Sequence, residues 1–396
     1  MKRQEHLSGL KVIPREFRAF FEGLLLVSGL MVLAIVGFLI AGIGKIFICW
    51  KKLIYLLGVL LLFGIAAWFY WVLYMPNPGN SGEFRTVFIP RGASARQVAE
   101  LLAKEKIVFS PDRFLLAAKL YKARRELKAG LYRLPLGESN AKVVRILRKG
   151  EVAEIKVSLP EGIRARKMAS IFQRKVGVDS AKFMALVKDT AFVHALGIDA
   201  NSLAGYLFPN TYFFPYEAGA KIVIRTLVDH FQKVFNDTLK NRTKEMGWTI
   251  HQVVTLASII EGEAKIDSER ALISAVYHNR LKKGMLLQAS PTIQFLIPNG
   301  PRRLLNKDLE IDSPYNTYRH PGLPPGPINN PGRKSILAAL YPAKVDYLYF
   351  VAKGDGSHVF TTTLRAHLIA KRNLDRLRRE YYRKHHNKWP ERDYKP

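Results

Sequence analysis

Two long runs without a charged residue dominate the pattern of hydrophobic and polar positions, at residues 23–44 and 53–75. Each is long enough to cross the hydrocarbon layer of about 30 Å as a helix. The second run ends in tryptophan and tyrosine residues, which suit the headgroup level, and a Pro- and Gly-rich linker follows at 76–82. A cleaved signal peptide fits poorly, because both runs exceed the usual apolar length. Residues 1–82 are therefore predicted to hold one or two transmembrane helices.

Charges near the two runs do not settle the topology. Residues 1–22 carry five Lys and Arg residues, and the connector 45–52 carries three. If both runs span the membrane, the positive-inside rule favours a cytoplasmic position for the rest of the chain. If only the second run spans, the same rule places the rest outside.

Beyond residue 82 the pattern mixes strand and helix periods, which is typical of an α+β protein. Segments 89–102 and 159–172 share Pro, Gly, Ala, Arg and Ala at an offset of 70 residues. In each copy a short β-type run meets a Pro-x-Gly turn and then an amphipathic helix. The first copy continues with a helix near 113–123 and a closing strand at 129–133. We expect a small βααβ module over residues 83–155.

A βααβ module of this size resembles LysM, a fold that binds glycans containing N-acetylglucosamine. A packing or spacer module without ligand affinity is the alternative. Aromatic residues are also dense in segment 205–214, where Tyr206 and Phe208 are candidates for the wall of a saccharide groove, because rigid aromatic surfaces suit the C–H faces of sugars. Core packing is the alternative for at least half of these rings.

A helix over residues 249–265 carries the candidate acid. Its apolar residues recur at i, i+3 and i+4, which predicts one buried face. Glu263 lies roughly 60° from the centre of that face and Glu261 roughly 100° from it. Glu261 also precedes Lys265 by four positions, the spacing of an exposed ion pair. We therefore expect Glu263 to be half-buried, with a raised pKa that suits a general acid. Glu261 is the second choice for this role.

The formal net charge of +30 at pH 7 predicts an acidic partner: nucleic acid, an anionic membrane face or an acidic wall polymer. Motifs of nucleic-acid binding are missing from the sequence, so we expect no nucleic acid. The single cysteine, Cys49, excludes an internal disulfide or a cysteine metal site. The histidines show no tight metal spacing, and we expect no metal and no cofactor. The basic segment 376–396 is expected to be a solvated tail.

An ordered set of short motifs resembles the endolytic murein transglycosylases, the MltG or YceG-like family. The motifs are ASIIEGE at 257–263, SER at 268–270, VYHNRL at 276–281, GMLLQ at 284–288, PT at 291–292, YNTY at 315–318, GLPPG at 322–326, PG at 331–332 and YLYFV at 347–351. The resemblance covers residues 84–375. It implies a mixed α+β catalytic domain over residues 156–375.

The resemblance implies that Glu263 is the catalytic residue, in agreement with its place on the helix. It implies cleavage of nascent peptidoglycan strands between N-acetylmuramic acid and N-acetylglucosamine. In this chemistry the C6 hydroxyl of the substrate attacks the anomeric carbon and closes a 1,6-anhydro ring. One carboxyl protonates the glycosidic oxygen and then takes the C6 proton, whereas ordinary glycosidases use two carboxylates.

Polar residues of the motifs are expected to position the strand, with loop capping as the alternative for each. The candidates are Asn279, Gln288, Asn316, Thr317 and Tyr318. One departure from the family is Ser290, which stands where the family usually has Asp. A carboxylate role at that position is absent or is taken over by Asp312.

Because peptidoglycan lies outside the cytoplasm, the resemblance implies a bacterial cytoplasmic membrane protein with an extracytoplasmic catalytic part. Expected partners are peptidoglycan strands and, from the resemblance, the glycan polymerases whose elongation the enzyme would terminate. Two alternatives stay open: a non-catalytic glycan-binding membrane scaffold of the wall-synthesis machinery, and a true hydrolase.

Overall fold

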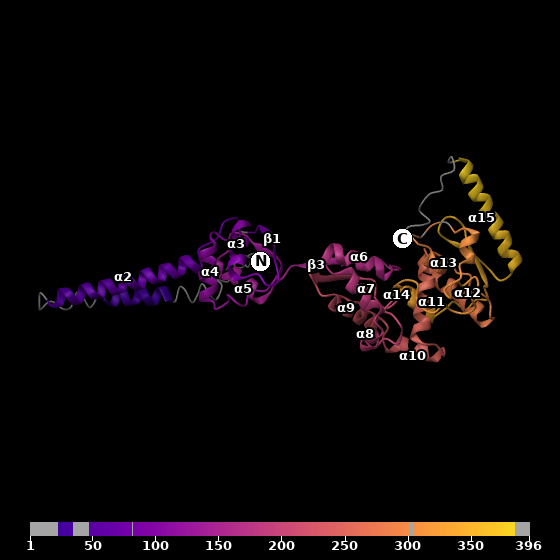
Figure 1. Cartoon of the computed structure of the whole chain (residues 1–396), viewed down its shortest axis with the longest axis horizontal. Coiled ribbons are helices and arrows are strands. Elements are labelled where there is room, and N and C mark those ends of the chain that lie inside the picture. Colours follow the sequence, from indigo (N-terminus) through magenta and orange to yellow (C-terminus); the bar gives the residue numbers. More distant parts are fainter. Residues whose placement is uncertain are drawn as a thin grey trace, which may run out of the picture. The chain divides into compact units, whose positions relative to one another are not determined.

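The computed structural model describes residues 23–34, 47–80, 82–298, 300, 302 and 304–384. The chain divides into two compact units, Met1–Val152 and Ala153–Pro396 (Figure 1). Part of the first apolar run and the last twelve positions, 385–396, lie outside the described residues. Residues 376–384, the start of the basic segment predicted as a solvated tail, form the end of helix α15, Leu364–Lys384.

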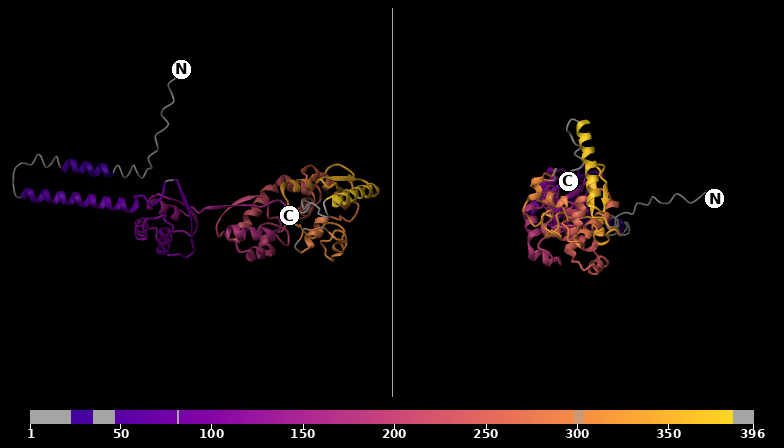
Figure 2. Two further views of the ribbon diagram at one scale, coloured as in Figure 1. Left: turned by 90° about the horizontal axis from the view of Figure 1, so that it is seen from above. Right: turned by 90° about the vertical axis from the view of Figure 1, so that its right-hand side faces the viewer.

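Helix α2, Phe47–Leu73, runs without a break into the first unit (Figure 2). Its part Lys52–Leu73 is long and apolar enough to cross a membrane, whereas the preceding apolar helix, Gly23–Ala34, is shorter. Most of its large apolar side chains are exposed, but Val72 and Leu73 are buried in the core of the unit. The amide of Asn140 donates to the Val72 carbonyl at 2.9 Å. The end of α2 is therefore part of the folded unit.

The segment after α2 is also fixed, although its Pro and Gly residues predicted a linker. Asn77 is only 5% exposed, and its side chain bonds to the Glu138 carbonyl and to Arg113. Pro76 forms an isolated β-bridge with Ser139. These contacts tie the segment to Arg113 and to residues 138–139 of the module that follows.

The first unit has the predicted βααβ order. Its elements are β1 (Phe84–Ile89), α3 (Ala95–Lys104), α4 (Pro111–Leu120), β2 (Gly130–Pro135) and α5 (Asn140–Lys149). Strands β1 and β2 pair antiparallel, and the inward residues Val87, Ile89, Tyr132 and Leu134 pack in one core with α3, α4 and α5. Helix α5 was not predicted, and it adds Val143, Val144 and Leu147 to that core.

The second copy of the repeat begins the second unit. Its elements are β3 (Glu154–Ser158), α6 (Ala165–Val176), α7 (Ser180–Lys188), α8 (Thr190–Ala195), β4 (Thr211–Pro215) and α9 (Ala220–Val234). Strand β3 pairs antiparallel with β4. Gly92 and Gly162 end the two Pro-x-Gly turns at φ values of 79° and 74°, a left-handed conformation that favours glycine. The predicted strand–turn–helix repeat is confirmed in both units.

The rest of the second unit is largely helical. Its elements are α10 (Asp237–Glu245), α11 (Ile250–Glu263), η1 (Asp267–Glu269), α12 (Arg270–Lys282), α13 (Ser290–Leu296), η2 (Asn306–Glu310), α14 (Arg333–Leu340), β5 (Tyr349–Ala352), β6 (His358–Thr361) and α15. Helix α11 starts with a capping box at Thr249, and all residues from Val253 to Ile260 are buried. The predicted single buried face of this helix is wrong, because α12, α13 and α14 pack around it.

Asn330 joins the two halves of the second unit. It is 1% exposed, and its Oδ1 accepts from the backbone amides of Gly205 at 2.9 Å and Leu207 at 3.1 Å. Its Nδ2 and its backbone amide both donate to the Ile163 carbonyl. One buried side chain thus holds the Pro-Glu-Gly turn, the aromatic segment and the loop beside α11 together.

Candidate active site

Glu263 lies at the C-terminal end of α11 and is half-buried, as the helical pattern predicted. The hydroxyl of Tyr277, on α12, donates to its Oε1 at 3.1 Å, and the backbone amide of Ser290 also bonds to the carboxyl. Burial raises the pKa of Glu263 to about 7, although these two hydrogen bonds act to lower it. At neutral pH the carboxyl can therefore both give and accept a proton.

The glycine between the two glutamates permits this geometry. A Cβ on Gly262 would lie 2.6 Å from the Cβ of Pro291, closer than two carbon atoms can pack. Pro291 stands in the first turn of α13, next to Ser290. Glycine thus lets the start of α13 approach α11 closely enough for the Ser290 amide to reach Glu263.

Ser290 and Tyr318 lie beside the carboxyl, and Gln288 precedes Ser290 by two positions. The hydroxyls of Ser290 and Tyr318 are 3.3 Å apart, and burial raises the pKa of Tyr318, which keeps it a donor at neutral pH. Gln288 is exposed, with a left-handed φ of 50° that is unusual for a residue with a side chain. Its backbone amide donates to the Thr317 carbonyl at 3.0 Å, which holds it beside the Tyr318 loop.

Two other predicted residues support that loop from behind. Thr317 is 1% exposed, and its hydroxyl accepts from the Ala289 amide at 2.9 Å. Asn316 is fully buried; its amide donates to two loop carbonyls, and its Oδ1 accepts from the Tyr318 amide. Asn279 is half-buried on α12 and donates to the carbonyls of Val345 and Tyr347. All three side chains therefore form hydrogen bonds to backbone groups and hold segments of the chain in place.

Tyr277 and Arg280 were missing from the predicted site. They are three positions apart on α12, on one helix face. Arg280 is 7% exposed, and it donates to the carbonyls of Leu286, Leu287 and Leu348 and to the Oε1 of Gln288. The motif VYHNRL contained both residues, but only the packing of α12 against α11 shows which of its side chains point to the acid.

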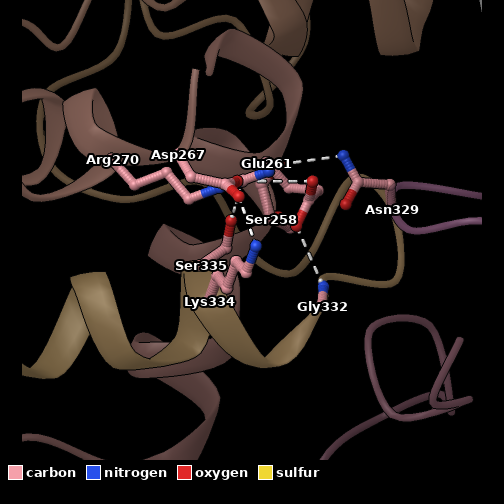
Figure 3. Close-up of polar contacts among 8 residues, drawn as sticks. All are labelled: Ser258, Glu261, Asp267, Arg270, Asn329, Gly332, Lys334 and Ser335. Carbon is pink, nitrogen blue, oxygen red and sulfur yellow. Dashed lines mark hydrogen bonds and ion pairs between the residues drawn. The ribbon is translucent and has the colours of Figure 1, made fainter. Parts of the chain in front are cut away.

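Glu261 is not the exposed partner of Lys265 that the spacing predicted. Its side chain is 6% exposed and accepts from Arg270, itself 8% exposed, at 3.1 Å (Figure 3). The backbone amide of Gly332 donates to its other oxygen at 2.9 Å. The prediction was wrong because α14 and the loop before it cover this side of α11. Charged and backbone donors thus occupy Glu261, whereas Glu263 has only neutral donors.

Arg270 links this carboxylate to α14. Its guanidinium also bonds to the hydroxyl of Ser335 and, at 3.1 Å, to Asp267, which is in turn paired with Lys334 (Figure 3). The network therefore connects the end of α11, the start of α12 and the start of α14.

The remaining predicted residues lie elsewhere. Tyr206 and Phe208 are 1% and 6% exposed in the core, and the Tyr206 hydroxyl contacts His251 near the other end of α11. The structure therefore does not bring these two rings to Glu263. Asp312 is exposed on the loop before Tyr315 and provides no described contact to Glu263. Among the described residues, no group of three or more His, Cys, Asp or Glu side chains could hold a metal ion.

Replacing Arg270 with Met is expected to destabilise the second unit by about 3–5 kcal/mol, because Glu261 would keep a buried charge without its partner. The double variant Arg270→Met/Glu261→Gln should recover much of this loss. Thermal unfolding of the purified full chain measures both. The control is Lys334→Met, which breaks a pair with both side chains more than half exposed and should cost under about 1 kcal/mol. Equal losses for Arg270→Met and the control would contradict the buried pair.

Three comparisons place the chain among known proteins. The YceG-like family matches residues 87–373. The endolytic murein transglycosylase of Bacillus subtilis (strain 168) is 34% identical over 315 residues, which cover 76% of this chain and 87% of that protein. The endolytic murein transglycosylase of Streptococcus pneumoniae is 30% identical over 312 residues, 70% of this chain and 56% of the longer relative.

A crystal structure of a YceG-like protein from Listeria monocytogenes aligns with a TM-score of 0.52 and 32% sequence identity. The alignment covers 73% of this chain and 99% of that one. The match to the family extends over both strand–turn–helix copies from residue 87 on, the Glu-Gly-Glu turn of α11 and the loops around it. The chain belongs to the YceG-like family.

Proposed function

We propose that this protein is an endolytic murein transglycosylase that cuts peptidoglycan strands between N-acetylmuramic acid and N-acetylglucosamine, with Glu263 as acid and base. The observation that carries the proposal is the half-buried Glu263 carboxyl, whose pKa is raised to about 7. A group with a pKa near the working pH is suited to transfer protons in both directions. The names of the relatives support the same activity.

In the proposed reaction the protonated Glu263 donates its proton to the glycosidic oxygen, and the bond from that oxygen to the anomeric carbon breaks. The C6 hydroxyl of the same muramic acid then bonds to the anomeric carbon. Its proton passes to the Glu263 carboxylate, so the enzyme returns to its starting state and no water is consumed. Because the nucleophile belongs to the substrate, the protein must mainly hold the sugar in the reactive conformation.

The state of Glu261 favours this reaction over hydrolysis. A two-carboxylate glycosidase needs a second carboxylate to activate water or attack the sugar. Glu261 is 6% exposed and ion-paired with Arg270, so it is not available for that role. A scaffold without catalysis is disfavoured for another reason. A carboxyl whose pKa is raised on folding lowers the free energy of unfolding at neutral pH. A purely structural residue at this position would reduce stability without a compensating function.

The substrate contacts follow from exposure. Ser290 and Tyr318 lie at the carboxyl and retain access to solvent, and Gln288, two positions before Ser290, is exposed. In the proposal these three side chains hold the acetamido and lactyl groups. Asn316 and Thr317 are assigned to positioning, because their polar atoms bond to the loops that carry these groups. Asn279 is assigned to holding the segment before β5, whose Val345 and Tyr347 carbonyls it binds.

For location, the proposal is that α2 anchors the chain in the bacterial cytoplasmic membrane, with residues 83–396 outside. Trp68, Tyr70 and Trp71 suit the headgroup level, and the buried Val72 and Leu73 follow directly. The first unit would therefore sit at the membrane surface, where a LysM-like module could hold newly made strands. Glycan polymerases are the proposed partners, and strand termination is the proposed role.

The change Glu263→Gln is expected to lower cleavage at least ~100-fold, because the amide cannot transfer the proton. The full chain, incubated with polymeric peptidoglycan, should produce fragments with 1,6-anhydro-N-acetylmuramic acid ends by mass spectrometry. The control Glu154→Gln changes an exposed glutamate of β3 and should retain activity. Ordinary reducing ends would indicate a hydrolase, and an uncut polymer a scaffold. Full activity of Glu263→Gln would refute the assignment of the acid.

Thermal unfolding shows whether the variant keeps its fold. The stability that the parent derives from burying a neutral Glu263 is complete below pH 4.5 and declines as the pH rises to about 7. The amide does not ionise. Glu263→Gln should therefore gain up to about 3 kcal/mol relative to the parent as the pH rises across this window.

The change Tyr277→Phe is expected to shift the pH profile. It removes a hydrogen bond that lowers the pKa of Glu263, so that pKa should rise above about 7. Because the free enzyme must be protonated, kcat/KM should fall above the pKa, and this falling limb should move to higher pH in the variant. The control Tyr341→Phe alters an exposed ring and should keep the parental profile. A falling limb that moves to lower pH in Tyr277→Phe would contradict the proposed role of this hydrogen bond.

Protease treatment of intact spheroplasts tests the location. External protease should degrade residues 83–396 and leave a protected fragment that contains α2. Complete protection of the chain, with digestion only after lysis, would place Glu263 in the cytoplasm and exclude access to the wall.

A further inference from the structure

A pocket lies near the N-terminal end of α11, within the second unit and apart from Glu263. It has a volume of about 710 Å³, and its lining includes Asp199, Asn201, Gln232, Lys240, His251 and Pro325. His251 is twelve residues before Glu263 on α11, which corresponds to about 18 Å along the helix. The pocket is therefore separate from the carboxyl that performs the proposed chemistry.

The floor of the pocket is rigid and apolar. Tyr206, Phe231 and Phe235 line it and are each no more than 2% exposed. Tyr206 stacks on His251 and bonds to its Nδ1 at 3.0 Å, while the His251 Nε2 bonds to the Pro325 carbonyl at 2.9 Å. Both nitrogens of the imidazole are thus occupied, and the ring serves as a fixed wall.

The rim offers hydrogen-bonding groups of mixed character. Asp199, Asn201 and Lys240 are exposed and bring a carboxylate, an amide and an ammonium group. The Nε2 of Gln232 donates to the Leu196 carbonyl, which leaves its Oε1 as a further acceptor. Charges of both signs do not select a phosphate or another anion. Donors and acceptors above an apolar floor suit a neutral, hydroxyl-rich ring with an acetamido group.

One chain segment borders both this pocket and the Glu-Gly-Glu turn. It begins at Pro325 beside His251, and the amide of Ile328 then donates to the Ser258 hydroxyl at 3.0 Å. Asn329 donates to the Ser258 carbonyl at 2.8 Å, and Gly332 reaches Glu261 (Figure 3). Residues 325–332 therefore follow α11 from the pocket to the turn and fix the spacing between the two sites.

We propose that this pocket is a distal saccharide subsite, which binds an uncleaved amino-sugar residue of the same glycan strand that Glu263 cuts. The inference rests on the proposed function and extends it to the choice of substrate. A strand that is long enough to occupy both sites gains binding energy from each. A fragment that is too short to span about 18 Å can bind only at Glu263. The subsite thus favours long strands and cleavage inside them.

The double variant Asp199→Ala/Asn201→Ala tests the subsite in the full chain. Both side chains are exposed, so the fold should be retained. With polymeric strands, kcat/KM should fall about tenfold through a higher KM, while kcat at saturation is kept. With fragments too short to span the two sites, kcat/KM should not change. The matched control Asp229→Ala/Asn241→Ala removes an exposed aspartate and asparagine outside the pocket and should match the parent on both substrates.

Polymeric strands stripped of their stem peptides identify the ligand. The same tenfold difference on stripped strands supports a saccharide site, whereas its disappearance would show that the pocket binds peptide and would overturn the proposal. An equal loss on short and long substrates, or no loss on long ones, would also overturn it. If the parent cuts neither substrate, the proposed function fails. Sedimentation of Glu263→Gln with stripped strands, with and without the Asp199→Ala/Asn201→Ala change, then tests the pocket alone.

Discussion

The buried ion pair between Glu261 and Arg270 is the interaction on which the active region depends. Two charges at 6% and 8% exposure are costly to bury unless they are paired and fully hydrogen-bonded. Here the Gly332 amide and the Ser335 hydroxyl complete the set. Because these groups come from α11, α12, α14 and the preceding loop, the pair holds the elements around Glu263 in one arrangement.

The same arrangement separates the roles of two glutamates that are only two residues apart. One carboxylate has a cation and a backbone donor, and its partners fix it in place. The other has a tyrosine hydroxyl and one amide in a half-buried site, so burial raises its pKa to about 7. The glycine between them allows α13 to approach. Environment, rather than residue type, thus gives the two glutamates different partners, and it raises the pKa of Glu263 to a value that suits the proposed acid.

One backbone segment contacts both ends of α11. Residues 325–332 run beside α11, and Asn330 within them anchors the Pro-Glu-Gly turn and the aromatic segment. A movement of this loop would therefore alter both ends of α11. In the first unit, the burial of Val72 and Leu73 similarly makes the end of α2 part of the folded module. The Pro- and Gly-rich segment 76–82, which was predicted to be a linker, is likewise tied to the module through Asn77 and Pro76.

The sequence alone determined the features that depend on local periodicity. It predicted the apolar run that becomes α2, the repeated strand–turn–helix, the βααβ order and the half-buried position of Glu263. The strand or helix period of a segment shows which of its faces is apolar, and it can be recognised without knowing what packs against that segment. The order of the motifs also indicated the family, which the comparisons then showed.

Only the tertiary structure decided which side chains meet. It paired Glu261 with Arg270 instead of leaving it exposed, brought Tyr277 and Ser290 to Glu263, and placed Tyr206 near the other end of α11. Helical spacing describes a helix with one covered face, but α10, α12, α13 and α14 all pack against α11. The partners of its polar residues come from positions up to 74 residues away in the chain, and no local pattern encodes such contacts.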